Sequence, residues 1–375
     1  MQNNRVVWLD VTRLVAMFTV VCCHCADPFN FYPGVPPAEI PFWGQIYGAL
    51  LRPCVPLFVM ITGALLLPVR EETSVFYQKR ISRVFWPFLI WSVLYCLFPW
   101  FTKLLGLSPE VILDFFPYAG EKVLEQSFSN SLEFIAQIPF NFMNTDVHMW
   151  YIYLLIGLYL YLPIFSAWVE KASERSKRWF LVAWMATTLL PYYYEYVNPY
   201  IWGGCAWNHF PMLYYFAGFN GYLLLGHYLR HTEWSLSKTL TWGIPLFIIG
   251  YAVTYVGFKH MAEMPGHTEE QFELFFTYNS LNVVIMTVPV FMLTKLVQVR
   301  SPKIQAVLAN LTLCGFGVYM VHYILTGPSI VWMRALQIPV CIQIPVGAVV
   351  SFGLSWLIVL LIRKISGRYA RYIVG

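Results

Sequence analysis

The chain has 375 residues, of which 58% are hydrophobic, 18% aromatic and only 11% charged, and its formal net charge is +5. Because soluble domains carry about 25% charged residues, this composition excludes an ordinary soluble protein and predicts an integral membrane protein. A positive charge suggests polyanionic partners in a soluble protein, but in a membrane protein its placement is more informative, and we expect no nucleic-acid partner.

Ten apolar runs are long enough to cross a membrane, which takes about 20 residues. They cover residues 6–25, 44–67, 85–105, 147–168, 179–197, 209–229, 240–258, 276–298, 306–326 and 342–362. Most of the 24 basic residues fall in the connections on one side, which the positive-inside rule identifies as cytoplasmic. The sequence therefore predicts an all-α polytopic membrane protein with about ten transmembrane helices and both termini cytoplasmic. We expect a single membrane-embedded domain over residues 1–375 with no separate soluble domain, and an amphipathic surface helix within 106–146.

The first run contains three ionisable residues, Asp10, Arg13 and His24. Such residues within a span are costly and are functional candidates by default. Arg13 and His24 are eleven residues apart, which places them on one helix face about 16 Å apart along the axis. Asp10 is close enough to pair with Arg13. Taken singly, Arg13 could be an arginine that reaches the interface, and His24 could be a packing histidine.

The second and third runs add more basic residues. Arg52 enters the membrane from the outer side, and Gly63 in the same run permits close helix approach. Three cations lie just before the third run, at the cytoplasmic face: Lys79, Arg80 and Arg83. They are either a topology anchor or a dock for a phosphorylated cytosolic ligand.

Two later histidines lie toward the outer side of their runs. His148 begins the fourth run beside Trp150, and His322 lies in the ninth run three residues after Tyr319. Each histidine alone is as consistent with packing or an interfacial position as with a site.

The eight cysteines have neither metal-ligand spacing nor the pattern of a disulfide framework. We therefore predict no metal site. Cys205 and Cys341 fall in connections that we expect on the same side, and whether they pair is left open.

Together these motifs resemble the membrane acyltransferase-3 family of bacterial surface-polysaccharide O-acyltransferases. The resemblance begins with "RLVAMFTVVCCH", in which Arg13 and His24 are separated by ten residues. It continues through "RPCVPLFVMITGALL", "KRISRVFWPFLIW" and "HMWYIYLLIGLYLYLPI" to "YMVH", and so covers nearly the whole chain. Thr62 stands where serine is commoner in the family, and "HMWYI" departs from its usual fourth-helix pattern.

The resemblance implies an O-acyltransferase, first of all an O-acetyltransferase, in the cytoplasmic (inner) membrane of a bacterium. Its co-substrate would be cytosolic acyl-CoA such as acetyl-CoA, with no tightly bound cofactor, and its acceptor a hydroxyl of a surface glycan or a glycolipid precursor. Arg13, Lys79, Arg80 and Arg83 would bind the donor. His24, oriented by Asp27, would be either a general base or a carrier of the acyl group. Candidates for positioning the acceptor or stabilising an oxyanion are Arg52, His148, Trp150, Tyr319 and His322.

Three other functions stay open at the level of sequence. A transporter or flippase commonly shows an inverted repeat, and none stands out here. A haem-bearing redox protein would need paired axial histidines, for which His24, His148 and His322 are candidates. A scaffold without chemistry would have no use for an arginine and a histidine on one face of a membrane helix.

Overall fold

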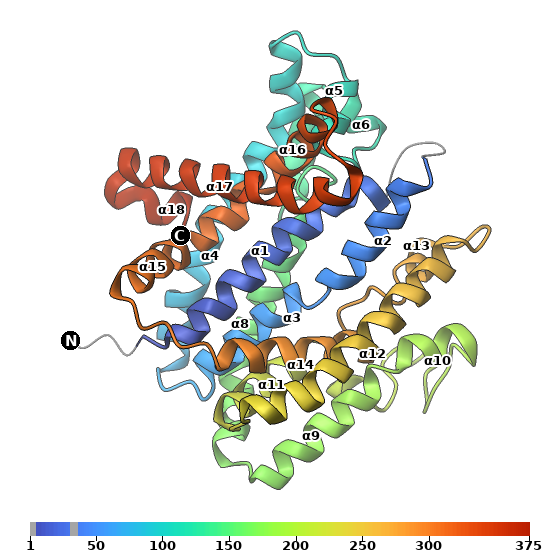
Figure 1. Cartoon of the computed structure of the whole chain (residues 1–375), viewed down its shortest axis with the longest axis vertical. Helices are drawn as coiled ribbons and strands as arrows, with labels where there is room; N and C mark the ends of the chain where they lie inside the picture. Colours follow the sequence, from blue (N-terminus) through green and yellow to red (C-terminus); the bar gives the residue numbers. More distant parts are fainter. Residues whose placement is uncertain (1–4, 31–36) are drawn as a thin grey trace. The chain divides into compact units, whose positions relative to one another are not determined.

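A computed structural model describes residues 5–30 and 37–375, which include every predicted site residue. The described chain is helical and contains no β-strand, only an isolated bridge between Cys205 and Asn208 (Figure 1). Among the described residues, seven helical segments are long and apolar enough to cross a membrane: Val7–Asn30, Glu39–Leu66, Thr73–Leu104, Val147–Lys171, Leu236–Ala262, Pro302–Val321 and Val340–Ile373. The protein is therefore a polytopic α-helical membrane protein, while the predicted count of ten spans is not confirmed.

The fifth, sixth and eighth predicted spans correspond to shorter helices. The fifth is divided between α9 (Glu174–Thr187) and α10 (Leu190–Tyr196), the sixth is divided between η2 (Tyr214–Phe216) and α11 (Asn220–His231), and the eighth contains α14 (Leu281–Lys295). At 1.5 Å per residue, α11 is only about 18 Å long. These helices are therefore shorter than the seven segments that are long enough to cross a membrane.

The chain divides into two compact units, which are described separately below. The first comprises residues 5–16, 48–70 and 161–305, and the second comprises 17–30, 37–47, 71–160 and 306–375. Four helices carry residues of both units: α1 (Val7–Asn30), α2 (Glu39–Leu51), α8 (Trp150–Lys171) and α15 (Pro302–Val321).

Close helix packing organises the first unit. Its other elements are α3 (Cys54–Leu66), α9, α10, η2 (Tyr214–Phe216), α11, α12 (Leu236–Ala262), α13 (Glu269–Phe272) and α14. Helices α3 and α11 pack together through Gly63 and Gly226: a Cβ on Gly63 would lie 1.9 Å from the Leu223 carbonyl oxygen, and one on Gly226 would lie 2.0 Å from that of Met60. The close approach predicted for Gly63 is confirmed, since neither position has room for a side chain.

The second unit is built around the long helix α4 (Thr73–Leu104). Glu72 caps this helix by accepting hydrogen bonds from the amides of Ser74 (2.9 Å) and Val75 (3.2 Å), which satisfies two of the amide groups that a helix start leaves free. The helix packs against α7 (Phe128–Gln137), the amphipathic helix expected within 106–146, and against α18 (Ala370–Ile373). The remaining elements are α5 (Glu110–Phe115), α6 (Glu121–Leu124), η1 (Val147–Met149), α16 (Tyr323–Ala335), α17 (Val340–Ser366) and η3 (Gly367–Tyr369).

The ninth predicted span is interrupted at His322. Helix α15 ends at Val321 and α16 begins at Tyr323, so the two residues on either side of His322 belong to different helices. Helix α16 then packs against α17 and against α5, where a Cβ on Gly327 would lie 2.0 Å from the Asp114 carbonyl oxygen. The interruption places a histidine and a tyrosine at a helix junction inside the second unit.

Candidate active site

Three histidines and two tyrosines from separate segments of the second unit gather into one group of rings. We call this group the histidine cluster: His24 on α1, His148 in η1, Tyr319 on α15, and His322 and Tyr323 at the junction of α15 and α16. The His24 and His322 ring centroids are 5.3 Å apart, those of His148 and His322 also 5.3 Å, and those of His24 and His148 6.3 Å. Residues that the sequence offered as separate candidates therefore contact one another.

Within the cluster, His24 forms a hydrogen-bonded pair with Asp27, one helical turn further along α1. The distance between His24 Nδ1 and Asp27 Oδ2 is 2.8 Å, and the two side chains are 17% and 14% exposed. A carboxylate accepts a hydrogen bond from Nδ1–H, so Nε2 of the neutral ring is the nitrogen that can accept. This arrangement suits a histidine that takes a proton from a substrate.

His322 is held in a similar tautomer by the backbone. Its Nδ1 lies 2.8 Å from the Tyr319 carbonyl oxygen, and because a carbonyl oxygen only accepts, Nδ1 carries the proton and Nε2 is an acceptor. The Tyr319 hydroxyl in turn donates to the His148 carbonyl oxygen. These bonds connect η1 to α15 and fix the mutual positions of two cluster segments.

Several buried polar atoms of the cluster have no hydrogen-bond partner among the described residues. They are both ring nitrogens of His148, Nε2 of His322 and the hydroxyl of Tyr323. His148, His322 and Tyr323 are each at most 1% exposed. Leaving a buried polar group unsatisfied costs about 1–3 kcal/mol, and such groups are rare enough in folded proteins to require a reason. Here they surround the partly exposed His24, as in a site that offers hydrogen bonds to a substrate.

Asp146 positions the start of η1, the segment that carries His148. Its carboxylate Oδ1 accepts a hydrogen bond from the Met143 amide (2.6 Å), and its carbonyl accepts one from the Met149 amide (2.8 Å). Burial raises the pKa of Asp146 to about 6, although the Met143 hydrogen bond acts in the opposite direction. This carboxyl group therefore shapes the loop that leads into η1.

The comparisons with known proteins identify the family. The sequence model of an acyltransferase domain, that of acyltransferase family 3, matches residues 6–360. The chain belongs to the acyltransferase-3 family. No curated protein and no solved structure matched the chain. Together with the membrane-spanning helices, the family match identifies a membrane acyltransferase.

In this acyltransferase, Arg13 lies on the same continuous helix as His24 but in the first unit. Arg13 Nη1 is 3.6 Å from Asp10 Oδ1, and Asp10, which is 7% exposed, also pairs with Arg5. The Asp10–Arg13 pairing expected from their spacing is present. Since a buried carboxylate needs compensating charge, part of the Arg13 charge is used to stabilise Asp10.

Arg52 also belongs to the first unit of the acyltransferase, where it is 8% exposed. Its Nε donates to the Gly48 carbonyl oxygen at 3.2 Å, and its guanidinium carbon lies 4.4 Å from the centre of the Phe276 ring and 5.2 Å from that of Tyr278. This environment holds the cation through backbone and ring contacts. The predicted role of Arg52 toward an acceptor stays a prediction.

Three of the four predicted donor-binding cations lie in the first three turns of α4, whereas Arg13 lies on α1. Lys79 is exposed and pairs with Glu71, Arg83 is exposed, and the guanidinium of Arg80 lies 6.0 Å from the Phe76 ring centre. Arg80 Nε is buried with no hydrogen-bond partner among the described residues. Further along the same helix, Tyr95 contacts His148 with ring centroids 5.2 Å apart. One helix therefore joins the basic segment to the histidine cluster.

Trp150 begins α8, two residues after His148, and is half-buried with its ring 6.0 Å from that of Tyr151. All eight cysteines, Cys205 and Cys341 among them, are free thiols. No group of three or more metal-ligating side chains was found in the part of the chain that the structure describes.

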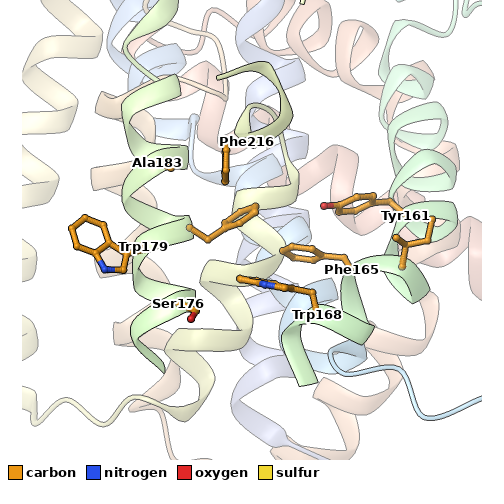
Figure 2. A pocket seen from close by; sticks show the side chains of 9 residues that line it. Tyr161, Phe165, Trp168, Ser176, Trp179, Ala183 and Phe216 are labelled. Atoms are coloured by element: carbon orange, nitrogen blue, oxygen red, sulfur yellow. The ribbon is translucent and has the colours of Figure 1, made fainter. Parts of the chain in front are cut away.

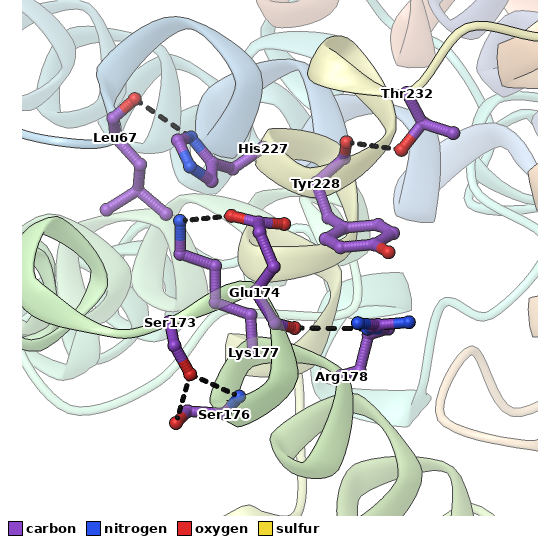
Figure 3. A network of polar contacts seen from close by, with 9 residues as sticks. All are labelled: Leu67, Ser173, Glu174, Ser176, Lys177, Arg178, His227, Tyr228 and Thr232. Carbon is purple, nitrogen blue, oxygen red and sulfur yellow. Dashed lines mark hydrogen bonds and ion pairs between the residues drawn. The ribbon is translucent and has the colours of Figure 1, made fainter.

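The first unit contains a groove and a buried histidine that differ chemically from the cluster. The groove, of about 750 Å³, lies between α8, α9 and η2 (Figure 2) and is lined by Tyr161, Ile164, Phe165, Trp168, Ser176, Trp179, Phe180, Ala183 and Phe216. Ser176 carries the only aliphatic hydroxyl of this lining, and none of the predicted site residues is part of it. Nearby, His227 donates from Nδ1 to the Leu67 carbonyl oxygen at 3.1 Å, beside the Lys177–Glu174 ion pair (Figure 3).

Sequence reasoning missed Tyr323 and Asp146. Tyr323 directly follows His322 in "VHYIL", but tyrosines near the ends of membrane helices are common in interfacial belts, so its position gave no distinct signal. Asp146 lies two residues before His148, in a loop where an aspartate is ordinary. Only the fold shows that both are buried in the second unit.

Proposed function

We propose that this membrane acyltransferase is an O-acyltransferase of a bacterial cytoplasmic membrane. It would transfer an acyl group, most simply acetyl, from cytosolic acyl-CoA to a hydroxyl of a surface glycan or of a lipid-linked glycan precursor. The observation that carries the proposal is the His24–Asp27 pair, with Nδ1 and Oδ2 2.8 Å apart, inside a buried cluster that has unsatisfied polar atoms.

His24 is the proposed general base. With Nδ1–H hydrogen-bonded to Asp27, its Nε2 would accept the proton of the acceptor hydroxyl, and Asp27 would stabilise the imidazolium that forms. The same nitrogen could instead accept the acyl group and pass it on in a second step. Trapping of labelled acyl on the protein distinguishes these two routes.

The basic start of α4 is the proposed binding site for the donor phosphates. Lys79, Arg80 and Arg83 supply the cations that phosphate recognition requires, and Arg13 on α1 would guide the donor. Arg83 and Tyr95 are twelve residues apart on α4, which is about 18 Å along the helix axis. This separation is similar to the reach of an extended pantetheine arm, so a donor held at the basic segment could bring its thioester to the cluster. Trp150, His148 and Arg52 are proposed to position the acceptor.

The test uses purified protein in lipid vesicles with labelled acetyl-CoA and a glycan fraction. We expect label to appear on the glycan as an ester that mild alkali releases, only when protein and donor are both present. Movement of glycan across vesicles without acyl-CoA, combined with no donor consumption, would identify a transporter and overturn the proposal.

A further inference from the structure

The rings of three buried tyrosines, Tyr95, Tyr319 and Tyr323, contact His148, and their hydroxyl groups differ. The Tyr95 hydroxyl donates to the Met320 carbonyl oxygen at 2.9 Å, and the Tyr319 hydroxyl donates to that of His148. The Tyr323 hydroxyl has no hydrogen-bond partner among the described residues, although Tyr323 is 1% exposed. Of these three hydroxyls, that of Tyr323 therefore makes no hydrogen bond within the described part of the chain.

The ring of Tyr323 is held firmly in place. It stacks on His148, with ring centroids 4.7 Å apart, and on Phe116 at 5.9 Å, and it meets the His24 ring edge-on at 5.0 Å. A phenylalanine would make the same packing contacts without burying an unsatisfied hydroxyl. Within the described part of the chain the hydroxyl thus makes no stabilising hydrogen bond, and it is carried by a ring that contacts the proposed base.

Acyl transfer needs a hydrogen-bond donor where negative charge develops on the carbonyl oxygen. In their neutral forms, His24 and His322 use their Nδ1–H groups in hydrogen bonds to Asp27 and to the Tyr319 carbonyl, so each presents only an acceptor. Neutral His148 has one N–H without a partner among the described residues, and the Tyr323 hydroxyl is the other donor of the cluster in that position. A phenol with an ordinary pKa near 10 carries its proton at neutral pH. We propose that the Tyr323 hydroxyl donates a hydrogen bond to the acyl carbonyl oxygen of the donor, and this inference rests on the proposed acyltransferase function.

In the proposed step, the acceptor hydroxyl oxygen attacks the thioester carbonyl carbon while His24 Nε2 removes the hydroxyl proton. The new C–O bond forms, and the carbonyl π electrons move to the oxygen that Tyr323 hydrogen-bonds. Collapse of this oxyanion breaks the C–S bond, and the CoA sulfur leaves with the proton from His24. The products are an ester and free CoA thiol, and Tyr323 keeps its own proton throughout.

The test compares Tyr323→Phe with Tyr95→Phe in the purified, full-length protein, measuring release of CoA thiol, acyl transfer to glycan and thermal stability. Removing one oxyanion donor typically lowers kcat by about 100-fold or more, so we expect Tyr323→Phe to lose about 100-fold in kcat with little change in KM. Since the Tyr323 hydroxyl has no hydrogen-bond partner among residues 5–30 and 37–375, the Tm of this variant should not fall. Tyr95→Phe leaves the Met320 carbonyl without its partner, so we expect a lower Tm and a kcat within about threefold of wild type.

The opposite pattern overturns the inference. If wild-type protein transfers acyl groups and Tyr323→Phe retains its kcat, Tyr323 is not the donor, while the proposed function stands. If wild-type protein consumes no acyl-CoA with any acceptor, the function and the inference both fail. A loss of kcat in Tyr323→Phe that matches its loss of folded protein would likewise reduce Tyr323 to a structural role.

Discussion

Replacing Asp27 by asparagine tests how His24 works. Asparagine keeps the size of the side chain but removes the charge, and its amide would donate to His24 Nδ1, which moves the ring proton to Nε2 and blocks the base. The two side chains are 17% and 14% exposed and 2.8 Å apart. Two opposite charges about 4 Å apart interact by about 4 kcal/mol at an effective dielectric constant of about 20. Loss of this stabilisation of the imidazolium corresponds to about a 1,000-fold decrease in kcat.

The assay is release of CoA thiol by purified Asp27→Asn protein at saturating donor and acceptor. Asp27→Glu, which keeps the charge, should recover part of the lost kcat. Asp114→Asn is the matched control, because Asp114 is an exposed aspartate of the same unit, and it should behave as wild type. A kcat for Asp27→Asn within threefold of wild type would refute the assignment of Asp27 to His24.

Three further predictions concern donor binding, pH and packing. Changing Lys79 and Arg83 together to alanine should raise the KM for acyl-CoA about tenfold or more and leave kcat unchanged, because charge-assisted phosphate contacts would be lost. Asp146 holds its proton more tightly in the folded state, with a pKa of about 6 against 3.8, so its cost to stability develops as pH rises through this window and reaches about 3 kcal/mol at pH 7. Asp146→Asn should therefore raise Tm at pH 7.5 and weaken the decline of Tm between pH 5 and 7.5. Gly327→Ala should lower stability by about 2 kcal/mol or more, measured by thermal unfolding, because its Cβ would lie 2.0 Å from the Asp114 carbonyl oxygen.

Controls from the same unit separate these effects from general damage. Lys122 is exposed and pairs with Glu133, so Lys122→Ala should not change the KM for acyl-CoA. A Cβ on Gly353 would meet no atom within 4 Å, so Gly353→Ala should leave Tm unchanged or slightly raised. An unaltered KM in the Lys79/Arg83 variant, a pH profile of Tm shared by Asp146→Asn and wild type, or a normal Tm for Gly327→Ala would each contradict its prediction.

The membrane class and the long helices could be predicted because a bilayer favours few charged residues and requires apolar runs of about 20 residues. Hydropathy could not separate a full span from a short helix such as α11, because the apolar residues of "HFPMLYYFAGF" extend the run without continuing the helix. The helix break at His322 could not be predicted either, since "VYMVHYIL" contains neither proline nor glycine.

The candidate site was predictable where its residues share a helix. Arg13, His24 and Asp27 lie on α1, so spacing alone related them. His148 and His322 come from segments that are far apart in the sequence. Their contact depends on tertiary packing, which residue spacing in one sequence cannot predict. Tyr323 and Asp146 were missed because burial, rather than residue type, distinguishes them from interfacial and loop residues.

The most direct test of the account is a paired count of products made by wild-type and His24→Ala protein in vesicles with labelled acetyl-CoA and a glycan acceptor. We predict that wild type releases one CoA thiol for each alkali-labile acetyl ester formed on the glycan, and that His24→Ala, verified as folded, forms neither product above background. Wild-type protein that forms no ester, or a folded His24→Ala variant that forms it at the wild-type rate, would contradict the account.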